Sequence, residues 1–290
     1  METIKPLMST GETGSQDGFE PIPEGAPVEA RAAESARLPA ARCVLSEKRF
    51  DAYLVESGES PEMLNESCRQ REIAFREVGE GTGKPIDRDP FDDHYLHIFL
   101  WDRESQALAG AYRLGLTDRI ISEHGAEGLY CSSLFHFEPD FLDFLNPGIE
   151  MGRSFIVPAY QRMMQPLALL WKGMSRFVAD NPRYRQLYGP VSISHDYTPI
   201  SKHLIVEFME RKLRHPTLAK LVRPRNPFDP GPIGGLEAGQ ISDSLRDIRE
   251  VSARIADNEP DGKGVPILLK HYLRLNATLL SFNVDPEFSN

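Results

Sequence analysis

The sequence predicts an α/β domain built on a mixed sheet flanked by helices, and two observations support this prediction. Two apolar runs, residues 94–102 and 107–116, are separated by the charged segment RESQ, a pattern typical of an antiparallel hairpin. Around this hairpin, segments with helical apolar spacing alternate with shorter strand-like runs, and the sequence has no internal repeat. The order helix, hairpin, strand, helix, strand, helix and strand is that of helices packed on a mixed sheet.

The first 42 residues differ in composition from the rest of the chain. They are rich in Gly, Pro, Glu, Ser and Ala and poor in aromatic residues. Such a segment buries too little apolar surface to offset the loss of chain entropy, so residues 1–42 are predicted to be a disordered tail. A single domain is expected over residues 43–290.

The first ordered elements are expected directly after this tail. Residues 43–57 combine apolar and aromatic positions that suit an opening strand or turn. Residues 60–78 begin with a serine at the cap position, a proline at the first helical position and an early glutamate, which together predict a helix. One face of this helix carries Met63, Leu64, Ser67, Cys68, Arg71 and Phe75.

Further helices and strands are predicted after the hairpin. Helices are expected at residues 132–145, at 166–182 from Pro166, and at 198–215. Strands are expected at residues 148–157, where Pro158 stops the run, and at 184–194, and residues 264–288 should form a helix and a final strand. Residues 223–262 are rich in Pro and Gly and then polar, which predicts an insertion or lid with one helix near 242–256.

Composition narrows the class of protein. The net charge is −10, from 33 basic and 43 acidic residues, which argues against a protein that wraps nucleic acid but permits a local basic patch. The three cysteines are far apart and form no CxxC pair, so zinc ribbons and disulfide frameworks are excluded. The chain has no signal-peptide pattern, and its apolar runs are far shorter than the ~20 residues of a membrane span. A soluble cytoplasmic protein is expected.

The stretch from residue 76 to 101 carries glycines, a lysine, aspartates and histidines that suggest phosphate or metal binding. A Walker loop needs a glycine five residues before Gly83 and a hydroxyl after Lys84, but the sequence has Val78 and Pro85 there. His94 and His97 lie three apart on a predicted strand and therefore point to opposite faces. Neither a nucleotide loop nor a metal site is predicted.

Two catalytic patterns are tested in the same way. His97 and Asp102 have the H-x4-D spacing of glycerolipid acyltransferases, but on a strand this spacing sends the two side chains to opposite faces. Ser194, His195 and Asp196 are consecutive and lack a G-x-S-x-G elbow, so they do not build a triad.

Charged residues inside or beside apolar segments are the remaining signal. A buried charge is costly without a partner, so such residues form a structural ion-pair network or serve a site, and both readings stay open. They are Arg71 on the first helix, Asp89 and Asp92 in the following loop, Arg113 in the second hairpin strand, and Glu150 and Arg153 in residues 148–157.

These residues resemble a motif set of the GNAT superfold acyltransferases that make acyl-homoserine lactones. The matching elements are R-x-x-x-F (Arg71, Phe75), D-x-x-D (Asp89, Asp92), a strand arginine (Arg113) and E-x-x-R (Glu150, Arg153). Still closer is the similarity to the ornithine and glycine N-acyltransferases of aminolipid synthesis, often labelled hemolysin-like. The segments that carry it are REIAFREVGEGTG, FDDHYLHIFLWD, GAYRLG, EMGRSFIVPAYQ, LLWKG and GPVSIS, within a resemblance that covers residues 43–222 and the C-terminal part from GVPILLKHYL onwards.

The resemblance implies a GNAT-like, mostly antiparallel central sheet and an N-acyltransferase. Such an enzyme would move a long-chain acyl group, with or without a 3-hydroxyl, to the amino group of ornithine or glycine and give a lyso-aminolipid. The chain has no room for the lysophospholipid acyltransferase domain often fused to this branch. The glycines of the usual phosphate-binding turn are missing after Gln161 and Arg162, which favours acyl carrier protein over acyl-CoA as the donor. No permanently bound cofactor is expected.

Roles for individual residues follow from the resemblance. Glu150 is expected to be the base, because an amine needs to lose a proton before it attacks a thioester. Arg71, Arg113 or Arg153 is expected to bind the substrate carboxylate, and the backbone after Glu150 to supply an oxyanion hole. Phe75, Asp89 and Asp92 complete the substrate side, and Phe155, Val157, Gln161 and Arg162 the donor side. Phe75, Trp101, Phe135, Phe137 and Phe155 line an acyl pocket or belong to the core.

A docking surface is expected at residues 211–225, which contain no acidic residue. Its basic residues are Arg211, Lys212, Arg214, Lys220, Arg223 and Arg225. Three interpretations stay open: contact with an acidic acyl carrier protein, peripheral contact with anionic lipid of the inner membrane, or an ordinary solvated helix end. The rival functions are O-acylation of a lysolipid and a binding protein that has lost turnover.

Overall fold

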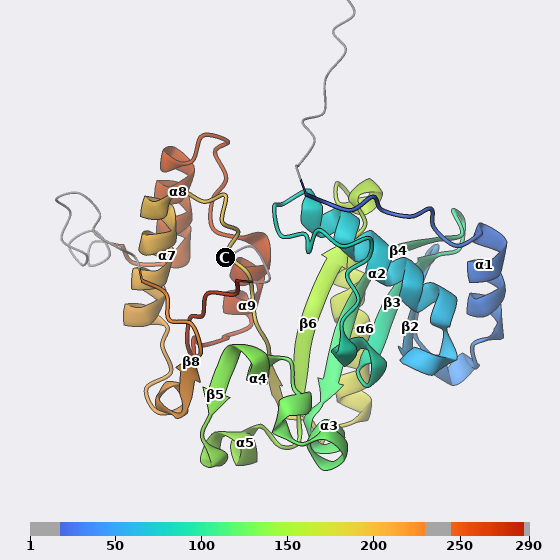
Figure 1. Cartoon of the computed structure of the whole chain (residues 1–290), viewed down its shortest axis with the longest axis horizontal. Coiled ribbons are helices and arrows are strands. Elements are labelled where there is room, and N and C mark those ends of the chain that lie inside the picture. Colours follow the sequence, from blue (N-terminus) through green and yellow to red (C-terminus); the bar gives the residue numbers. More distant parts are fainter. Residues whose placement is uncertain (1–17, 230–244, 287–290) are drawn as a thin grey trace, which may run out of the picture.

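The structure is a computed structural model that describes residues 18–229 and 245–286. Its centre is a six-stranded sheet of order β1-β2-β3-β4-β6-β7 (Figure 1). The strands are β1 (Cys43–Glu47), β2 (Phe50–Glu56), β3 (Leu96–Asp102), β4 (Ala107–Leu116), β6 (Gly148–Ile156) and β7 (Gln186–Tyr188). Every neighbouring pair is antiparallel except β6 and β7, which run parallel. The predicted fold class, a mostly antiparallel sheet flanked by helices, is confirmed.

Helices cover both faces of this sheet. Helix α2 (Pro61–Arg76) lies over β4 and β6, and α6 (Gln165–Asp180) packs on β1, β2, β3 and β4 (Figure 1). Arg113 of β4 and Arg71 of α2 both bind the carboxylate of Asp92, whereas the neighbouring Tyr112 packs against Trp171 of α6. Because successive strand residues point to opposite faces, α2 and α6 lie on opposite sides of the sheet.

Strand β6 is irregular at its centre. Its register with β4 pairs Arg113 with Gly152 but Ala111 with Phe155, so β6 has one extra residue there. Arg153 within this β-bulge has a φ of 52°, a left-handed conformation that is uncommon for residues other than glycine. Bulges re-aim side chains, and this one directs Arg153 to the face of the sheet that α2 covers.

Strand β7 is much shorter than the run 184–194 predicted from the sequence. It pairs with β6 only as far as Tyr188, opposite Glu150. The chain then comes so near to β6 that a Cβ on Gly189 would lie 2.0 Å from the Met151 carbonyl oxygen, and Pro190 follows without an N–H to donate. The two strands therefore stop pairing midway along β6.

The segment between β4 and β6 contains α3 (Thr117–His124) and three short elements where a single helix was predicted over 132–145. These are α4 (Cys131–Leu134), β5 (Phe135–Phe137) and α5 (Pro139–Leu145). The single-helix prediction is wrong because Phe135–Phe137 pair with β8 (Val222–Pro224) as a two-stranded sheet. Pro139 then begins a new helix.

The C-terminal part forms a helical lobe with its own apolar core (Figure 1). It consists of α7 (Pro199–Lys212), α8 (Ile248–Asn258) and α9 (Ile267–Arg274). Helix α9 joins this lobe to the sheet, since Leu269 belongs to the lobe core while Tyr272 packs against Tyr112 and Trp171. The predicted final strand is reduced to an isolated bridge between Leu279 and Arg214.

The predicted insertion at residues 223–262 is only partly described. Its helix is present as α8, and its first residues belong to strand β8. Residues 230–244 lie outside the described residues. No helix in the described part of the chain combines the length and apolar character needed to cross a membrane.

The N-terminal prediction needs a correction for residues 28–42, while residues 1–17 lie outside the described residues. Helix α1 (Val28–Arg37) is formed in the stretch that composition predicted to be disordered. It is held by contacts with α2 that local composition does not reveal. Arg31 pairs with Glu66 at 3.0 Å, and Glu34 accepts hydrogen bonds from the Ser60 hydroxyl and from the N–H groups of Glu62 and Met63. The N-terminus of α2 is thus capped by a carboxylate from another helix.

We expect Glu34→Ala to lower the free energy of unfolding by about 1–3 kcal/mol, because three donors at the start of α2 lose a charged acceptor. Denaturant titration followed by circular dichroism measures this. Glu29→Ala, which removes an exposed carboxylate in the first turn of the same helix, is the matched control and should stay within about 0.5 kcal/mol of the wild type. Equal losses in both variants would show that Glu34 stabilises α1 and not the start of α2.

Candidate active site

Three arginines and three aspartates form a charged cluster between α2 and the sheet. The arginines Arg71, Arg113 and Arg153 come from α2, β4 and β6, and the aspartates Asp87, Asp89 and Asp92 come from the segment between α2 and β3. Helix, bulge and loop therefore bring together residues that lie up to 82 positions apart (153 − 71 = 82).

Each arginine of the charged cluster contacts two of the aspartates. Arg71 Nε lies 2.9 Å from Asp87 Oδ2, and its Nη2 lies 2.9 Å from Asp92 Oδ2. Arg113 Nη1 lies 2.5 Å from Asp89 Oδ1 and 3.1 Å from Asp92 Oδ1. Arg153 reaches Asp89 at 3.3 Å and Asp87 at 3.7 Å. The charged residues predicted for the substrate side are therefore brought together, and they pair with one another and with Asp87.

Burial makes these charges depend on each other. Burial by itself raises the pKa of Asp92, but the guanidinium groups of Arg71 and Arg113 outweigh it and hold the pKa well below its ordinary value. The pKa of Asp89 is lowered in the same way, against its burial, chiefly by Arg113. Both carboxylates are thus ionised, and the cluster is a set of ion pairs between α2 and the sheet.

Aromatic rings enclose the Arg113 guanidinium. Its Cζ lies 5.7, 5.0 and 5.5 Å from the ring centroids of Phe91, Tyr95 and Tyr130. The Tyr130 ring also lies 5.1 Å from the guanidinium of Arg153, and its hydroxyl donates to Asp285 Oδ2 at 3.2 Å. The Tyr130 ring therefore packs against the guanidinium groups of both Arg113 and Arg153.

Glu150 lies on the same face of the sheet as Arg113. Its partner on β4 is Gly115, two residues after Arg113, and cross-strand partners share a face. Its Oε2 accepts from the Tyr95 hydroxyl at 2.5 Å, and its Oε1 accepts from the Cys131 N–H at 2.6 Å. The residue is 1% exposed, and burial raises the pKa of its carboxyl in spite of these donors. A proton from solvent or substrate reaches Glu150 only through the groups around it.

Tyr188 is a neighbour of Glu150 that sequence reasoning missed. It is the cross-strand partner of Glu150 at the last pair between β6 and β7, and its hydroxyl is a buried group without a hydrogen-bond partner among the described residues. Burial raises the pKa of this hydroxyl well above its ordinary value, and the Glu150 charge adds to this. Sequence reasoning also missed Asp87, Tyr95 and Cys131. Like Tyr188, they are brought to the site only by the fold.

The residues predicted for the acyl donor are not assembled into one pocket. Phe155, Val157, Phe75 and Trp101 are buried in the main core of the sheet. Phe135 and Phe137 instead pack with Phe141 in a separate cluster beside β8, so an acyl pocket lined by all five aromatics is excluded. Gln161 and Arg162 are exposed in the turn before α6.

His97 and Asp102 do not form a catalytic pair. His97 Nε2 lies 2.9 Å from the Asp92 carbonyl oxygen, and burial lowers the pKa of this histidine to about 4. Asp102 instead accepts from the Tyr160 hydroxyl at 2.9 Å, at the other end of β3. The described residues contain no group of three or more His, Cys, Asp or Glu side chains suited to a metal ion.

The basic residues at 211–225 form a weaker positive surface than their sequence suggests. Four of them pair with carboxylates: Arg211 with Glu207, Arg214 with Glu210, Arg223 with Glu138, and Arg225 with Glu127 at 3.9 Å. Lys212 and Lys220 are exposed and have no ion pair within the described part of the chain. Most of the positive charge that this surface can offer to a partner is therefore on these two lysines.

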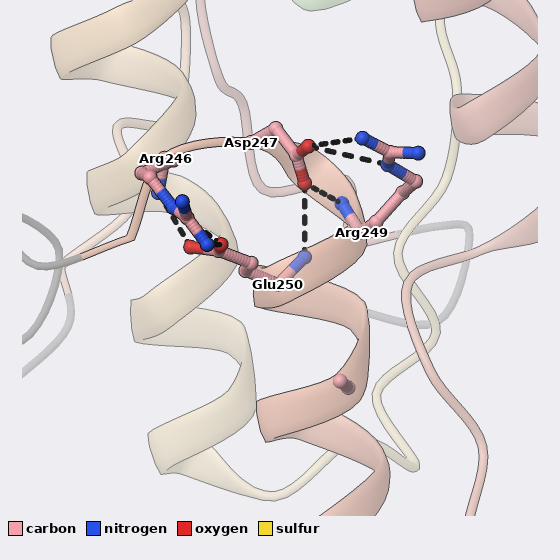
Figure 2. A pocket seen from close by; sticks show the side chains of 5 residues that line it. Arg246, Asp247, Arg249 and Glu250 are labelled. Atoms are coloured by element: carbon pink, nitrogen blue, oxygen red, sulfur yellow. Dashed lines mark hydrogen bonds and ion pairs between the residues drawn. The ribbon is translucent and has the colours of Figure 1, made fainter.

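A separate hollow of about 430 Å³ lies at the start of α8. Figure 2 shows Arg246 against Glu250, and Arg249 against Asp247. Asp247 also accepts from the N–H groups of Arg249 and Glu250, so the free donors of this helix end are already occupied. Each arginine of the hollow is neutralised by an adjacent carboxylate, so the hollow offers no net positive charge to an anionic ligand and is not the candidate site.

Comparison with known proteins places these features in a family. Residues 70–172 match the family model described as an acetyltransferase (GNAT) domain. The chain is 32% identical over 258 residues to a glycine N(alpha)-acyltransferase of Bacteroides thetaiotaomicron, an alignment that covers 82% of this chain and 74% of the relative. It is 30% identical over 190 residues to a protein of the same name from Phocaeicola vulgatus, over 62% of this chain and 58% of the relative. The matched GNAT region contains all the residues of the charged cluster and Glu150.

Proposed function

Since this chain belongs to the family of GNAT N-acyltransferases that includes these two relatives, we propose that it transfers a fatty acyl group from a thioester donor to the α-amino group of a small amino acid. Glycine is the first candidate acceptor, because both relatives are named for it. Ornithine, which the sequence motifs also suggested, is the second. The product is an N-acyl amino acid, a lyso-aminolipid when the acyl chain is long.

The observation that carries this proposal is the interruption of the sheet between β6 and β7. Beyond the pair of Glu150 with Tyr188, β6 continues to Ile156 without a described partner strand on that side. Backbone N–H groups along such an edge can donate to a thioester carbonyl and to the oxyanion that forms from it. The bulge at Arg153 lies within this same stretch.

The reaction needs a nucleophile and a proton acceptor. The amine nitrogen attacks the thioester carbonyl carbon, the carbon–sulfur bond breaks, and the thiol leaves with a proton while the amine loses one. An α-ammonium group is protonated at neutral pH, so a base takes its proton. We assign this role to Glu150, whose raised pKa suits a general base, with the proton passing through the groups that surround it.

The carboxylate of the amino acid needs a cationic partner. Of the three clustered arginines, Arg71 and Arg113 are 1% exposed. The side chain of Arg153 is 11% exposed, and its contacts with the aspartates are the longest of the three. Arg153 is therefore the arginine that we assign to the substrate carboxylate.

The proposal is tested by incubating the purified chain with long-chain acyl carrier protein or acyl-CoA and with glycine, ornithine or a lysophospholipid. Mass spectrometry of the extracted products should show N-acylglycine or N-acylornithine, formed in proportion to enzyme. Acylated lysophospholipid as the sole product would replace the proposal by the O-acyltransferase reading. If no product forms with either donor, a binding function would replace the proposal.

We further propose that the donor is an acyl carrier protein that docks at Lys212 and Lys220. Carrier proteins are acidic, so reversing both charges (Lys212→Glu, Lys220→Glu) is expected to raise KM for the acyl carrier about five- to tenfold at low salt. The KM for acyl-CoA should not change, and the effect should shrink as salt rises. Lys48→Glu, in the turn between β1 and β2, is the control. An equal effect on both donors would show that the lysines do not serve carrier docking.

A further inference from the structure

The centre of β6 is open where a sheet between two helix layers is normally closed. Residues 148–151 and Phe155 are buried, whereas residues 152–154 are partly exposed. A Cβ built on Gly152 would meet no atom within 4 Å, although β4 and β7 flank this strand in the sheet. An open space therefore lies directly over Gly152, beside the bulge.

A cationic group borders this space. Gly152 is the cross-strand partner of Arg113, so its missing side chain would point to the face that carries the charged cluster. The bulge turns the next residue, Arg153, to that same face, where its guanidinium lies against Tyr130 and Asp89. Because Gly152 has no side chain, there is room next to Arg153, the most accessible arginine of the cluster.

A buried carboxylate outside the cluster lies within electrostatic range of the same arginine. Glu80 is 8% exposed in the loop after α2, and its Oε2 accepts from the Ser192 hydroxyl at 2.9 Å. Burial raises the pKa of Glu80, the Asp196 charge adds to this, and the Ser192 hydroxyl together with the charges of His195 and Arg153 opposes it. Glu80 therefore lies within electrostatic range of Arg153, where the α2 loop meets the chain after β7.

Glu80 adds a carboxylate beside a cluster whose own charges balance. The three arginines of the cluster balance its three aspartates (3 − 3 = 0), and Glu80 is added to this neutral set. An α-amino acid brings an ammonium and a carboxylate on one carbon atom, so it offers an ammonium to Glu80 and a carboxylate to Arg153, in addition to the contacts of Arg153 with Asp87 and Asp89. A neutral amine or an acid alone supplies only one of the two.

We propose that the space over Gly152 is the amino-acid subsite, with the carboxylate of the acceptor at Arg153 and its ammonium group at Glu80. This assignment rests on the proposed N-acyl transfer. It makes Gly152 a specificity-determining residue, because any side chain there takes the volume that the acceptor needs. It also assigns a role to Glu80, which received none in the sequence analysis and lies outside the ion pairs of the charged cluster.

The test is Gly152→Ala, since the added methyl group meets no protein atom and should leave folding intact. With acyl donor held at saturation, we expect KM for glycine to rise about 10- to 100-fold, the range that one methylene group produces in a fitted pocket. KM for the donor should stay within twofold. Gly58→Ala, in the short turn before α2 and likewise free of contacts within 4 Å, is the matched control and should leave all constants unchanged.

Glu80→Gln tests the ammonium contact. It should raise KM for glycine about tenfold, since a charge-assisted hydrogen bond is lost. Glu77→Gln, an exposed carboxylate three residues earlier, is its control. Glycinamide, which lacks the carboxylate but keeps the ammonium group, should be a poor acceptor for the wild type and should lose as much as glycine does in Glu80→Gln. Ser192→Ala separates loop support from substrate contact, because it keeps the Glu80 charge and should change KM for glycine by less than threefold.

The outcomes separate this subsite from the proposed function. An unchanged KM for glycine in Gly152→Ala, or a fall in kcat alone, overturns the subsite while acyl transfer stands. Calorimetric titration of glycine into wild type and Gly152→Ala adds a measurement without turnover. Binding that is lost in Gly152→Ala, in a protein that acylates no amine, supports the subsite and overturns the transfer. A wild type that neither binds nor acylates glycine or ornithine overturns both.

Discussion

Glu150→Gln is expected to lower kcat by about 10²- to 10⁴-fold, the range that general base catalysis contributes. The glutamine keeps the shape of the side chain and an oxygen that accepts from the Cys131 N–H. It cannot accept a proton from the amine. Steady-state kinetics with glycine and a saturating donor measures the loss, and denaturant titration of the same sample reports whether the fold is retained.

Tyr95→Phe is the control that separates a base from a structural carboxylate. It removes the Tyr95 donor from Glu150 Oε2, and with it the contact of the Tyr95 hydroxyl with the Tyr130 N–H, but it leaves the carboxylate in place. We expect a loss of about 1–3 kcal/mol in stability and less than a tenfold loss in kcat. If Tyr95→Phe and Glu150→Gln lose the same rate, Glu150 acts by holding residues 130–131 and is not the base.

The pH profile gives a second measurement on Glu150. Burial raises the pKa of its carboxyl, so the ionised, proton-accepting form is lost as pH falls through a value above that of an ordinary glutamate. The acid limb of kcat/KM should therefore lie at higher pH than a solvent-exposed glutamate would give. The part of this limb that belongs to Glu150 should be missing from the residual activity of Glu150→Gln.

Asp92→Asn is expected to lower the free energy of unfolding by about 3–5 kcal/mol. Asp92 is fully buried and accepts from both Arg71 and Arg113, so a neutral amide leaves two buried guanidinium groups short of one negative charge. The amide also places its own NH2 donor next to the N–H donors of the two arginines. Denaturant titration at neutral pH measures the change, and a loss below about 1 kcal/mol would contradict the assignment of Asp92 as the centre of the ion pairs.

The neighbouring aspartate provides a matched control. Asp93 pairs with Arg88 at 2.8 Å, but its side chain is 66% exposed, so Asp93→Asn should cost less than about 1 kcal/mol. The folded-state pKa of Asp92 is depressed, so its contribution to stability is present above the unfolded-state pKa of about 3.9 and is lost as pH falls through the folded-state value. The difference between wild type and Asp92→Asn should therefore shrink below about pH 4.

Local patterns were enough to predict most of the sheet. The hairpin of β3 and β4 has continuous apolar runs on both sides of a charged turn, and the structure confirms it. Strand β6 and helix α6 are marked by Pro158 and Pro166. The convergence of Arg71, Asp92 and Arg113 was also foreseen, because charges placed in apolar segments need partners.

The errors have a common cause in contacts between distant segments. Helix α1 forms because Glu34 caps a helix that begins 27 residues later, at Pro61 (61 − 34 = 27). Strand β5 forms because it meets β8, some 85 residues away (222 − 137 = 85). Strand β7 ends early because Gly189 comes close to the backbone of β6. Glu80 and Tyr188 carry no local sequence signal and become visible only when their neighbours are known.

Tyr112 and Arg113 are adjacent on β4 and point to opposite sides, one to Tyr272 of α9 and the other to the buried ion pairs. The helical lobe is consequently joined to the same strand that carries Arg113 of the charged cluster. A change in the twist of β4 would therefore shift both the contact with Tyr272 and the buried ion pairs of Arg113. Chimaeras that exchange this lobe between homologous enzymes should therefore keep turnover only when the incoming helix restores the tyrosine contact.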